Sequence, residues 1–181
     1  MALTLTVACS QTTQTKEKET SLAYKYFKQI NYNPQKYTLK LKTKDQEITI
    51  SKNKDKTYYK NQNQKIIEKN GQRYIIEKDT YTKEPIINLT NYTKGYLPEN
   101  INNLKKQKYK TGTERKGLLK YKTETYTYSE GKITYYFRKN KLTHIRNKTI
   151  QNDITITVIS LTNKIDKKEY NLPKEKETIT Y

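Results

Sequence analysis

The chain has 181 residues, enough for one domain with a hydrophobic core, and a formal charge of +19 from 37 Lys and Arg against 18 Asp and Glu. A single cysteine excludes an intramolecular disulfide, and with a single histidine it leaves no Cys/His zinc constellation, so we expect no metal and no cofactor. The hydrophobic share is only 32%, but 18 tyrosines add area that strands can bury, which favours a folded, mainly β protein with a thin core.

The positive charge has two explanations. A basic surface attracts polyanions such as nucleic acid, anionic lipid headgroups or cell-wall polymers. The basic residues are, however, spread along the whole chain, and Lys, Asn, Ile and Tyr share A/T-rich codons. Genomic composition therefore explains the charge equally well.

Residues 1–19 read MALTLTVACSQTTQTKEKE, a short apolar run that ends in Ala8 and Cys9 and is followed by a polar tether. This resembles the end of a bacterial lipoprotein signal peptide, in which the lipobox cysteine is acylated and becomes the mature N-terminus. Thr6 stands where Leu is usual. No basic region precedes the apolar run, and a truncated gene start would explain both this absence and the shortness of the run. The resemblance implies lipidation of Cys9, export, and a lipid anchor on the outer face of the cell membrane. A frayed strand with a buried thiol is the alternative.

No apolar run approaches the ~20 residues that a helix needs to span a bilayer, so attachment to a membrane would be through lipid. Lysines near an anionic surface each gain on the order of 1 kcal/mol. The candidates for such contacts near the tether are Lys16, Lys18, Lys25 and Lys28.

Residues 20–181 are expected to form a single domain that begins with a helix. Leu22, Tyr26 and Ile30 recur at four-residue steps, which predicts an amphipathic helix capped by Thr20 or Ser21. Asn33-Pro34 would end it. Short alternating runs then predict strands at 37–41, 47–50, 57–60, 65–68, 73–76 and 80–82, with Asn70-Gly71 as a hairpin turn.

The segment from Glu84 to Lys108 lacks this alternation and carries Pro85, Gly95 and Pro98. We expect loop and short helical turns, with residues 100–106 helical. Such a segment is suited to cover an opening or to plug a concave sheet.

From Leu118 to Pro173 the alternation returns, broken by short polar turns at 129–131, 138–141 and 148–153, which predicts a consecutive antiparallel meander. The apolar residues on alternate positions of this meander and of the strands predicted at 37–41 and 47–50 are candidates to line a core or a ligand cavity. They are Leu39, Leu41, Ile48, Ile50, Tyr135, Phe137, Ile154, Ile156 and Val158.

The order of these features resembles the LolA/LppX-like bacterial lipoproteins: a lipobox-like cysteine, a tether, a helix, a meander, an irregular middle and a second meander. The second meander carries Tyr135-Tyr136-Phe137, Leu142 and Ile145, and the chain closes with Tyr170-Asn171-Leu172-Pro173. The resemblance implies an α+β, mainly β fold: a strongly curved antiparallel sheet, or half-barrel, with helices on its concave face. It also implies a lipid or other hydrophobic ligand in the cavity.

Catalysis finds little support. His144 has no nearby pattern of a nucleophilic site, and no phosphate-binding, zinc-protease or calcium-loop motif occurs, so we predict that the protein is not an enzyme. Nucleic-acid binding is favoured by interleaved runs such as Lys108-Tyr109-Lys110 and Lys120-Tyr121-Lys122, but recognised motifs are missing.

Three hypotheses follow. The first is an exported, lipid-anchored, non-enzymatic envelope lipoprotein that binds a hydrophobic ligand or another envelope component. The second is an envelope interaction protein whose half-barrel is filled by its own helices. The third is a basic Tyr/Lys-rich module that binds nucleic acid or an anionic cell-wall polymer. An apolar cavity of several hundred Å³ under the middle segment would favour the first over the second.

Overall fold

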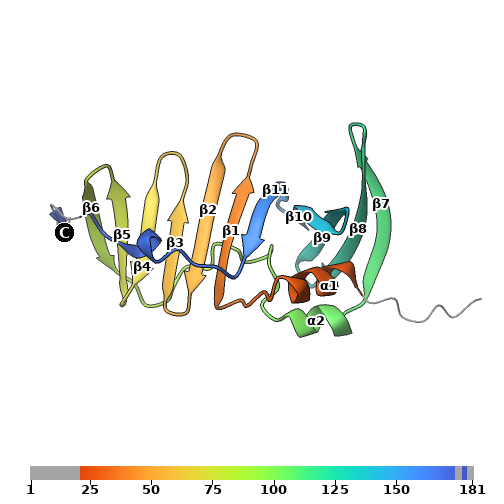
Figure 1. Cartoon of the computed structure of the whole chain (residues 1–181), viewed down its shortest axis with the longest axis horizontal. Helices are drawn as coiled ribbons and strands as arrows, with labels where there is room; N and C mark the ends of the chain where they lie inside the picture. Colours follow the sequence, from red (N-terminus) through yellow and green to blue (C-terminus); the bar gives the residue numbers. More distant parts are fainter. Residues whose placement is uncertain (1–20, 174–176, 179–181) are drawn as a thin grey trace, which may run out of the picture.

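The computed structural model describes residues 21–173 and 177–178, which build one open sheet with two short helices on one of its faces (Figure 1). The N-terminal half contains α1 (Leu22–Gln29), β1 (Lys36–Lys42), β2 (Glu47–Asn53), β3 (Lys56–Lys60), β4 (Lys65–Lys69), β5 (Gln72–Glu77) and β6 (Thr80–Pro85). The C-terminal half contains α2 (Ile101–Lys106), β7 (Tyr109–Lys116), β8 (Leu119–Tyr128), β9 (Gly131–Arg138), β10 (Lys141–Thr149), β11 (Asp153–Thr162), the 3₁₀ turn η1 (Lys167–Tyr170) and β12 (Glu177–Thr178).

The sheet consists of two meanders joined through β1 and β11. The described strands follow the order β12-β6-β5-β4-β3-β2-β1-β11-β10-β9-β8-β7, and every neighbouring pair is antiparallel except β12 with β6. Leu39 faces Leu161 across the joint, and Leu41 faces Val158 after an irregularity in register. The prediction of a mainly β, antiparallel sheet with an N-terminal helix and a short helical middle segment is confirmed.

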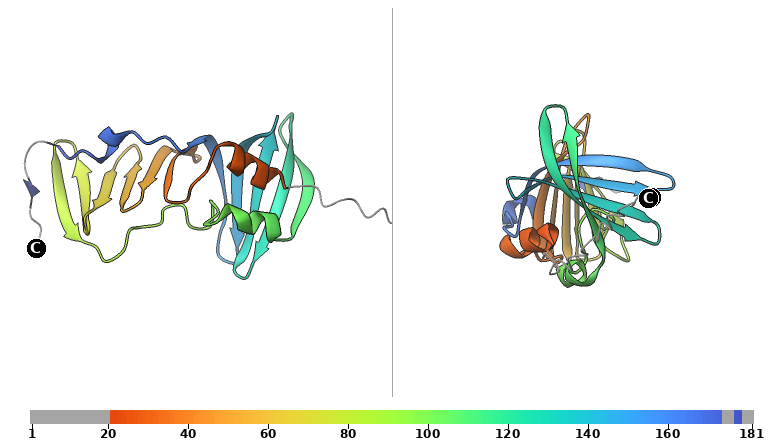
Figure 2. Two further views of the ribbon diagram at one scale, coloured as in Figure 1. Left: turned by 60° about the horizontal axis from the view of Figure 1, so that its bottom comes forward. Right: turned by 90° about the vertical axis from the view of Figure 1, so that its right-hand side faces the viewer.

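The sheet curves most strongly in its C-terminal half. Figure 2 shows β7–β11 turned against β1–β6, with α1 and α2 side by side on the enclosed face. The two ends of the described chain lie far apart: Ser21 is beside β8, whereas β12 pairs with β6 at the other edge.

The main core lies between α1, α2 and the enclosed face of the sheet. Ala23 and Phe27 of α1 are fully buried, and the Phe27 ring meets the Tyr135 ring edge-on with centroids 5.7 Å apart. Tyr126 packs against Tyr135 in the same way at 5.8 Å. Because the aliphatic content is low, these edge-to-face tyrosine and phenylalanine contacts supply much of the core.

A second, smaller core lies on the opposite face, where residues 163–173 cross β2 to β5. Tyr170 of η1 packs there with Tyr58, Ile67 and Ile76. The Ser51 hydroxyl donates to Glu169 Oε2 at 2.6 Å and so ties the crossing segment to β2. Because β4 and β5 are covered on both faces, each carries two adjacent isoleucines instead of a simple alternation.

Candidate functional site

The middle segment is held on the enclosed face of the sheet by a buried carboxylate. Glu68 of β4 is fully buried and accepts hydrogen bonds from the Thr90 amide at 2.7 Å and from the Thr90 hydroxyl at 2.6 Å. Arg73 of β5 donates to the same carboxylate at 2.8 Å and to Glu84 at 2.7 Å. A buried carboxylate needs this many donors, and here two of them come from Thr90 of the segment that it fixes.

A ring stack and a hydrogen bond continue the attachment along the segment. The Tyr92 ring stacks on the Tyr59 ring at 4.8 Å, and the Tyr37 hydroxyl is 2.7 Å from the Thr93 hydroxyl. Burial raises the pKa of Tyr37, whereas the bond to Thr93 lowers it. The segment is therefore fixed over β1 to β5 before it turns into α2.

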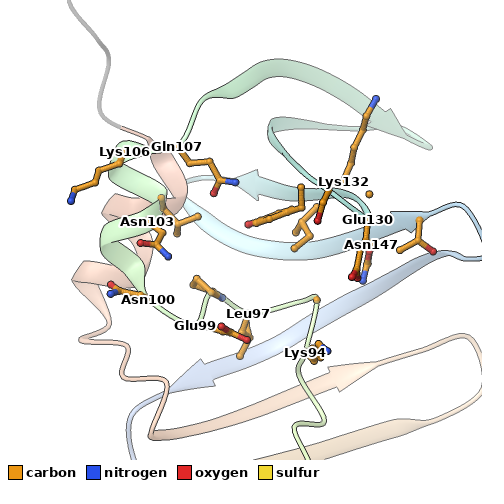
Figure 3. A pocket seen from close by; sticks show the side chains of 18 residues that line it. Lys94, Leu97, Glu99, Asn100, Asn103, Lys106, Gln107, Glu130, Lys132 and Asn147 are labelled. Atoms are coloured by element: carbon orange, nitrogen blue, oxygen red, sulfur yellow. The ribbon is translucent and has the colours of Figure 1, made fainter.

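A cleft opens where this segment leaves the sheet. Its volume is about 1020 Å³, and it lies between residues 94–100 and α2 on one side and the β8–β9 hairpin and the end of β10 on the other (Figure 3).

The floor of the cleft is apolar and continuous with the main core. Leu97, Leu104 and Ile133 line it and are themselves largely buried by the core. Tyr128, at the end of β8, adds a partly exposed ring with 39% of its surface accessible. Burial raises the pKa of Tyr128, so its hydroxyl stays protonated and neutral near neutral pH.

The rim of the cleft is polar. Asn100, Asn103 and Asn147 line it, and among the described residues Lys94, Lys106 and Lys132 form no ion pair. Figure 3 shows Lys106 and Lys132 extending away from the centre, so their charges lie at the periphery of the cleft. Glu99 and Glu130 also line the cleft and leave it with a mixed charge.

Two glycines allow the walls to approach each other. Gly95 has a φ of +80°, and a Cβ there would lie 2.6 Å from Asn147 Nδ2. At Gly131, a Cβ would overlap the Lys148 carbonyl. A side chain at position 131 would displace the end of β10 that forms the wall, whereas one at position 95 would push aside the Asn147 side chain and strain the backbone at its positive φ.

The residues predicted to line a core or cavity do not line this cleft. Most of them belong to the main core or pack against it: Leu39, Leu41, Ile48, Ile50, Tyr135, Phe137, Ile156 and Val158. Ile154 lies outside the core and is 44% exposed. Its neighbour on β10 is Asn147, a wall residue of the cleft, so this end of the sheet is open to solvent.

The lysines predicted to meet an anionic surface are only partly within the described structure. Lys25 and Lys28 are exposed on α1. Lys16, Lys18 and the predicted lipidation site Cys9 lie outside the described residues. The cleft residues Asn100, Asn103 and Asn147 were not singled out by the sequence, where the loss of alternation over 84–108 was the available signal.

His144 lies on the opposite face of the sheet from the cleft. Its ring meets the Tyr121 ring edge-on at 5.2 Å, and its Nδ1 is 3.0 Å from the Thr143 hydroxyl. Burial lowers its pKa, with a further contribution from Lys116 that Glu114 opposes. Within the described residues, no group of three His, Cys, Asp or Glu side chains is placed to hold a metal ion.

The chain matches no family model and no curated protein. In residues 21–173 and 177–178, no helix is both long and apolar enough to cross a membrane.

Proposed function

We propose that the protein is a non-enzymatic, lipid-anchored binding protein of the bacterial cell envelope that holds an amphipathic molecule in the cleft beside α2. The observation that carries this proposal is the cleft of about 1020 Å³ with an apolar floor and a polar rim. Ligand pockets of proteins commonly have volumes of roughly 300–1,000 Å³ and combine apolar walls with a few polar groups.

The lining determines the kind of ligand. An apolar chain or ring would lie on Leu97, Leu104 and Ile133, while the asparagine amides at the rim would bind a polar head by donating and accepting hydrogen bonds. Three lysines line the cleft against the two acids Glu99 and Glu130, and this excess of positive charge favours a head with negative charge. The predicted cavity-lining residues form a filled core, so the proposed site is shallower and more polar than a cavity within a half-barrel.

The cleft can be tested by filling it. Asn103 is exposed on α2 and lines the cleft, whereas its neighbour Asn102 is also exposed and does not line it. We expect Asn103→Trp to weaken binding of a dansyl-labelled fatty acid by about tenfold or more, since the indole would occupy the space of the ligand. Asn102→Trp is the matched control and should bind as the wild type does. Equal binding by both variants would contradict the cleft as the site.

The charge preference is tested with a second pair on the same helix. Lys106 lines the cleft and Lys105 does not, although both are exposed. Lys106→Glu should weaken binding of the anionic probe, whereas Lys105→Glu should have a smaller effect. The difference should shrink at high salt because exposed charges are screened.

The anchor is a separate part of the proposal. Expression with an upstream signal sequence in a Gram-positive host, followed by intact-mass measurement, should give a chain that begins at Cys9 and carries a diacylglyceryl group. An unmodified Cys9 behind an uncleaved leader would contradict the anchor and the exported location. It would not contradict binding in the cleft, which does not depend on the anchor.

Nucleic-acid binding is the less favoured alternative. Base stacking needs exposed ring faces. On the face of the sheet opposite the cleft, Tyr121 and Tyr136 are only 5% and 1% exposed, and Lys116 Nζ sits 4.4 Å from the centroid of the Tyr136 ring. A fluorescently labelled single-stranded oligonucleotide should therefore bind weakly, without dependence on Tyr121.

A further inference from the structure

The tip of the β7–β8 hairpin exposes apolar side chains. Leu118 is fully exposed and Leu119 is 39% exposed. The other described hairpin turns carry Lys, Asp, Asn, Gln, Gly, Ser, Thr or Glu at their tips, apart from Ile150 between β10 and β11. Figure 1 shows the β7–β8 hairpin projecting from its end of the sheet.

The backbone of the tip is suited to present Leu118. Gly117 has a φ of +59° and begins a two-residue turn. Turns of this class take glycine at the first central position and leave the second free for an ordinary residue. Leu118 therefore stands at the apex without backbone strain, and nothing in the described chain covers it.

Positive charge follows directly behind the apex. Arg115 on β7 and Lys120 on β8 are directly opposite each other in the ladder, and both are exposed. Like charges at such a position repel and destabilise the strand pair. The nearby acid Glu114 is the residue before Arg115 on β7, so its side chain lies on the other face of the strand, where it accepts a hydrogen bond of 2.8 Å from the Tyr136 hydroxyl.

We propose that this tip docks on the surface of a lipid bilayer that contains anionic lipid. Leu118 would enter the boundary between headgroups and acyl chains, while Arg115 and Lys120 would lie at the level of the phosphates. An apolar side chain with basic flanks suits both layers of such a surface. The phosphates also remove the repulsion between the two cations, so docking stabilises the hairpin that performs it.

This contact requires neither the acyl anchor nor the cleft. Ser21, which precedes α1, is bound to Glu124 on β8, and Glu124 is five positions from Leu119 on that strand. At roughly 3.3 Å per residue the tip lies about 17 Å from the start of the helix. A chain anchored at Cys9 could therefore keep the tip at the membrane, and the hairpin would then set the orientation of the domain.

The test uses the full chain with Cys9→Ser, so that no acyl group contributes, and sedimentation with vesicles of equimolar phosphatidylcholine and phosphatidylglycerol. Leu118→Ser should weaken vesicle binding by about tenfold or more, the factor expected for losing one buried leucine. Arg115→Gln with Lys120→Gln should weaken binding and reduce its dependence on salt. Vesicles of phosphatidylcholine alone should bind the wild type less.

Ile150→Ser is the matched control, because Ile150 is equally exposed at a hairpin tip but the nearby cations Arg146 and Lys148 are both paired with Asp153. It should bind vesicles within about twofold of the wild type if binding is oriented through the β7–β8 tip. Absence of vesicle binding by the wild type would overturn the proposal. So would equal binding by Leu118→Ser, or an equal loss in Ile150→Ser. Both positions are fully exposed, so circular dichroism should show unchanged folding.

Discussion

The Ser21 hydroxyl donates a hydrogen bond of 2.8 Å to Glu124, a residue 103 positions later on β8. The same carboxylate accepts the backbone amides of Leu22 at 2.5 Å and Ala23 at 3.0 Å, and Ser21 Oγ accepts the amide of Tyr24 at 3.0 Å. The first turn of a helix leaves its N–H groups unpaired, and its dipole attracts negative charge. Here the sheet supplies that negative charge and fixes where α1 begins.

Replacing this carboxylate should destabilise the whole domain. Glu124 is 2% exposed, so Glu124→Ala would leave several buried donors unpaired and should lower the free energy of unfolding by about 3 kcal/mol. Urea denaturation would measure this, with Glu130→Ala as an exposed control expected to stay within about 0.5 kcal/mol. Glu124→Gln keeps one acceptor and should fall between them. Equal midpoints for Glu124→Ala and Glu130→Ala would contradict the role assigned to the bond network.

Removing the cation beside the second buried carboxylate, Glu68, should act mainly on the middle segment. Arg73→Met removes the cation beside fully buried Glu68 and should cost about 2 kcal/mol, less than for a fully buried pair because the Arg73 side chain is 30% exposed. Hydrogen exchange at the Thr90 amide, which Glu68 accepts at 2.7 Å, should accelerate more than exchange in β9. Arg146→Met, which breaks the exposed pair with Asp153, should leave exchange at Thr90 unchanged.

Local features of this fold follow from the sequence because they depend on neighbouring residues. Ser21, one of the two predicted caps, caps α1, and Asn70 and Gly71 form the expected hairpin turn with φ of 53° and 72°. Asn100, which was predicted as the first residue of a helix, is the residue that caps α2. Each depends on a side chain or backbone preference that acts within four residues.

Long-range features did not follow from the sequence. The pairing of β1 with β11 joins residues over 100 positions apart, and periodicity cannot identify the partner of a strand. Glu68 and Glu124 resemble solvated carboxylates in the sequence, because their burial depends on donors from other segments. The cleft was only partly foreseen: the irregular segment 84–108 indicated where an opening would be covered, but not that β8–β10 would form the opposite wall.

We expect removal of the hydroxyl to change the free energy of unfolding differently at two buried tyrosines. Among the described residues the Tyr170 hydroxyl has no hydrogen-bond partner, whereas that of Tyr126 lies 2.5 Å from Ser21 Oγ and donates to Glu124 at 3.1 Å. Tyr170→Phe should leave the free energy of unfolding unchanged or raise it by about 1 kcal/mol, and Tyr126→Phe should lower it by about 1 kcal/mol. Thermal or urea unfolding of both variants makes the comparison. A clear loss in Tyr170→Phe would indicate a partner for its hydroxyl outside the described residues.

His144 is the single histidine of the chain, so its titration can be followed without assignment by the C2 proton in NMR spectra. Burial lowers its pKa, Lys116 lowers it further and Glu114 partly opposes them, so we expect a value below 6.5. Because the unfolded state then binds the proton more tightly, this residue's contribution to stability is complete above pH 6.5 and falls as the pH drops below it. Lys116→Gln should raise the pKa of His144 and Lys110→Gln, an exposed position on the same strand, should not. A pKa of 6.5 or higher in the wild type would mean that His144 is more solvated than its position between Tyr121 and Tyr136 indicates.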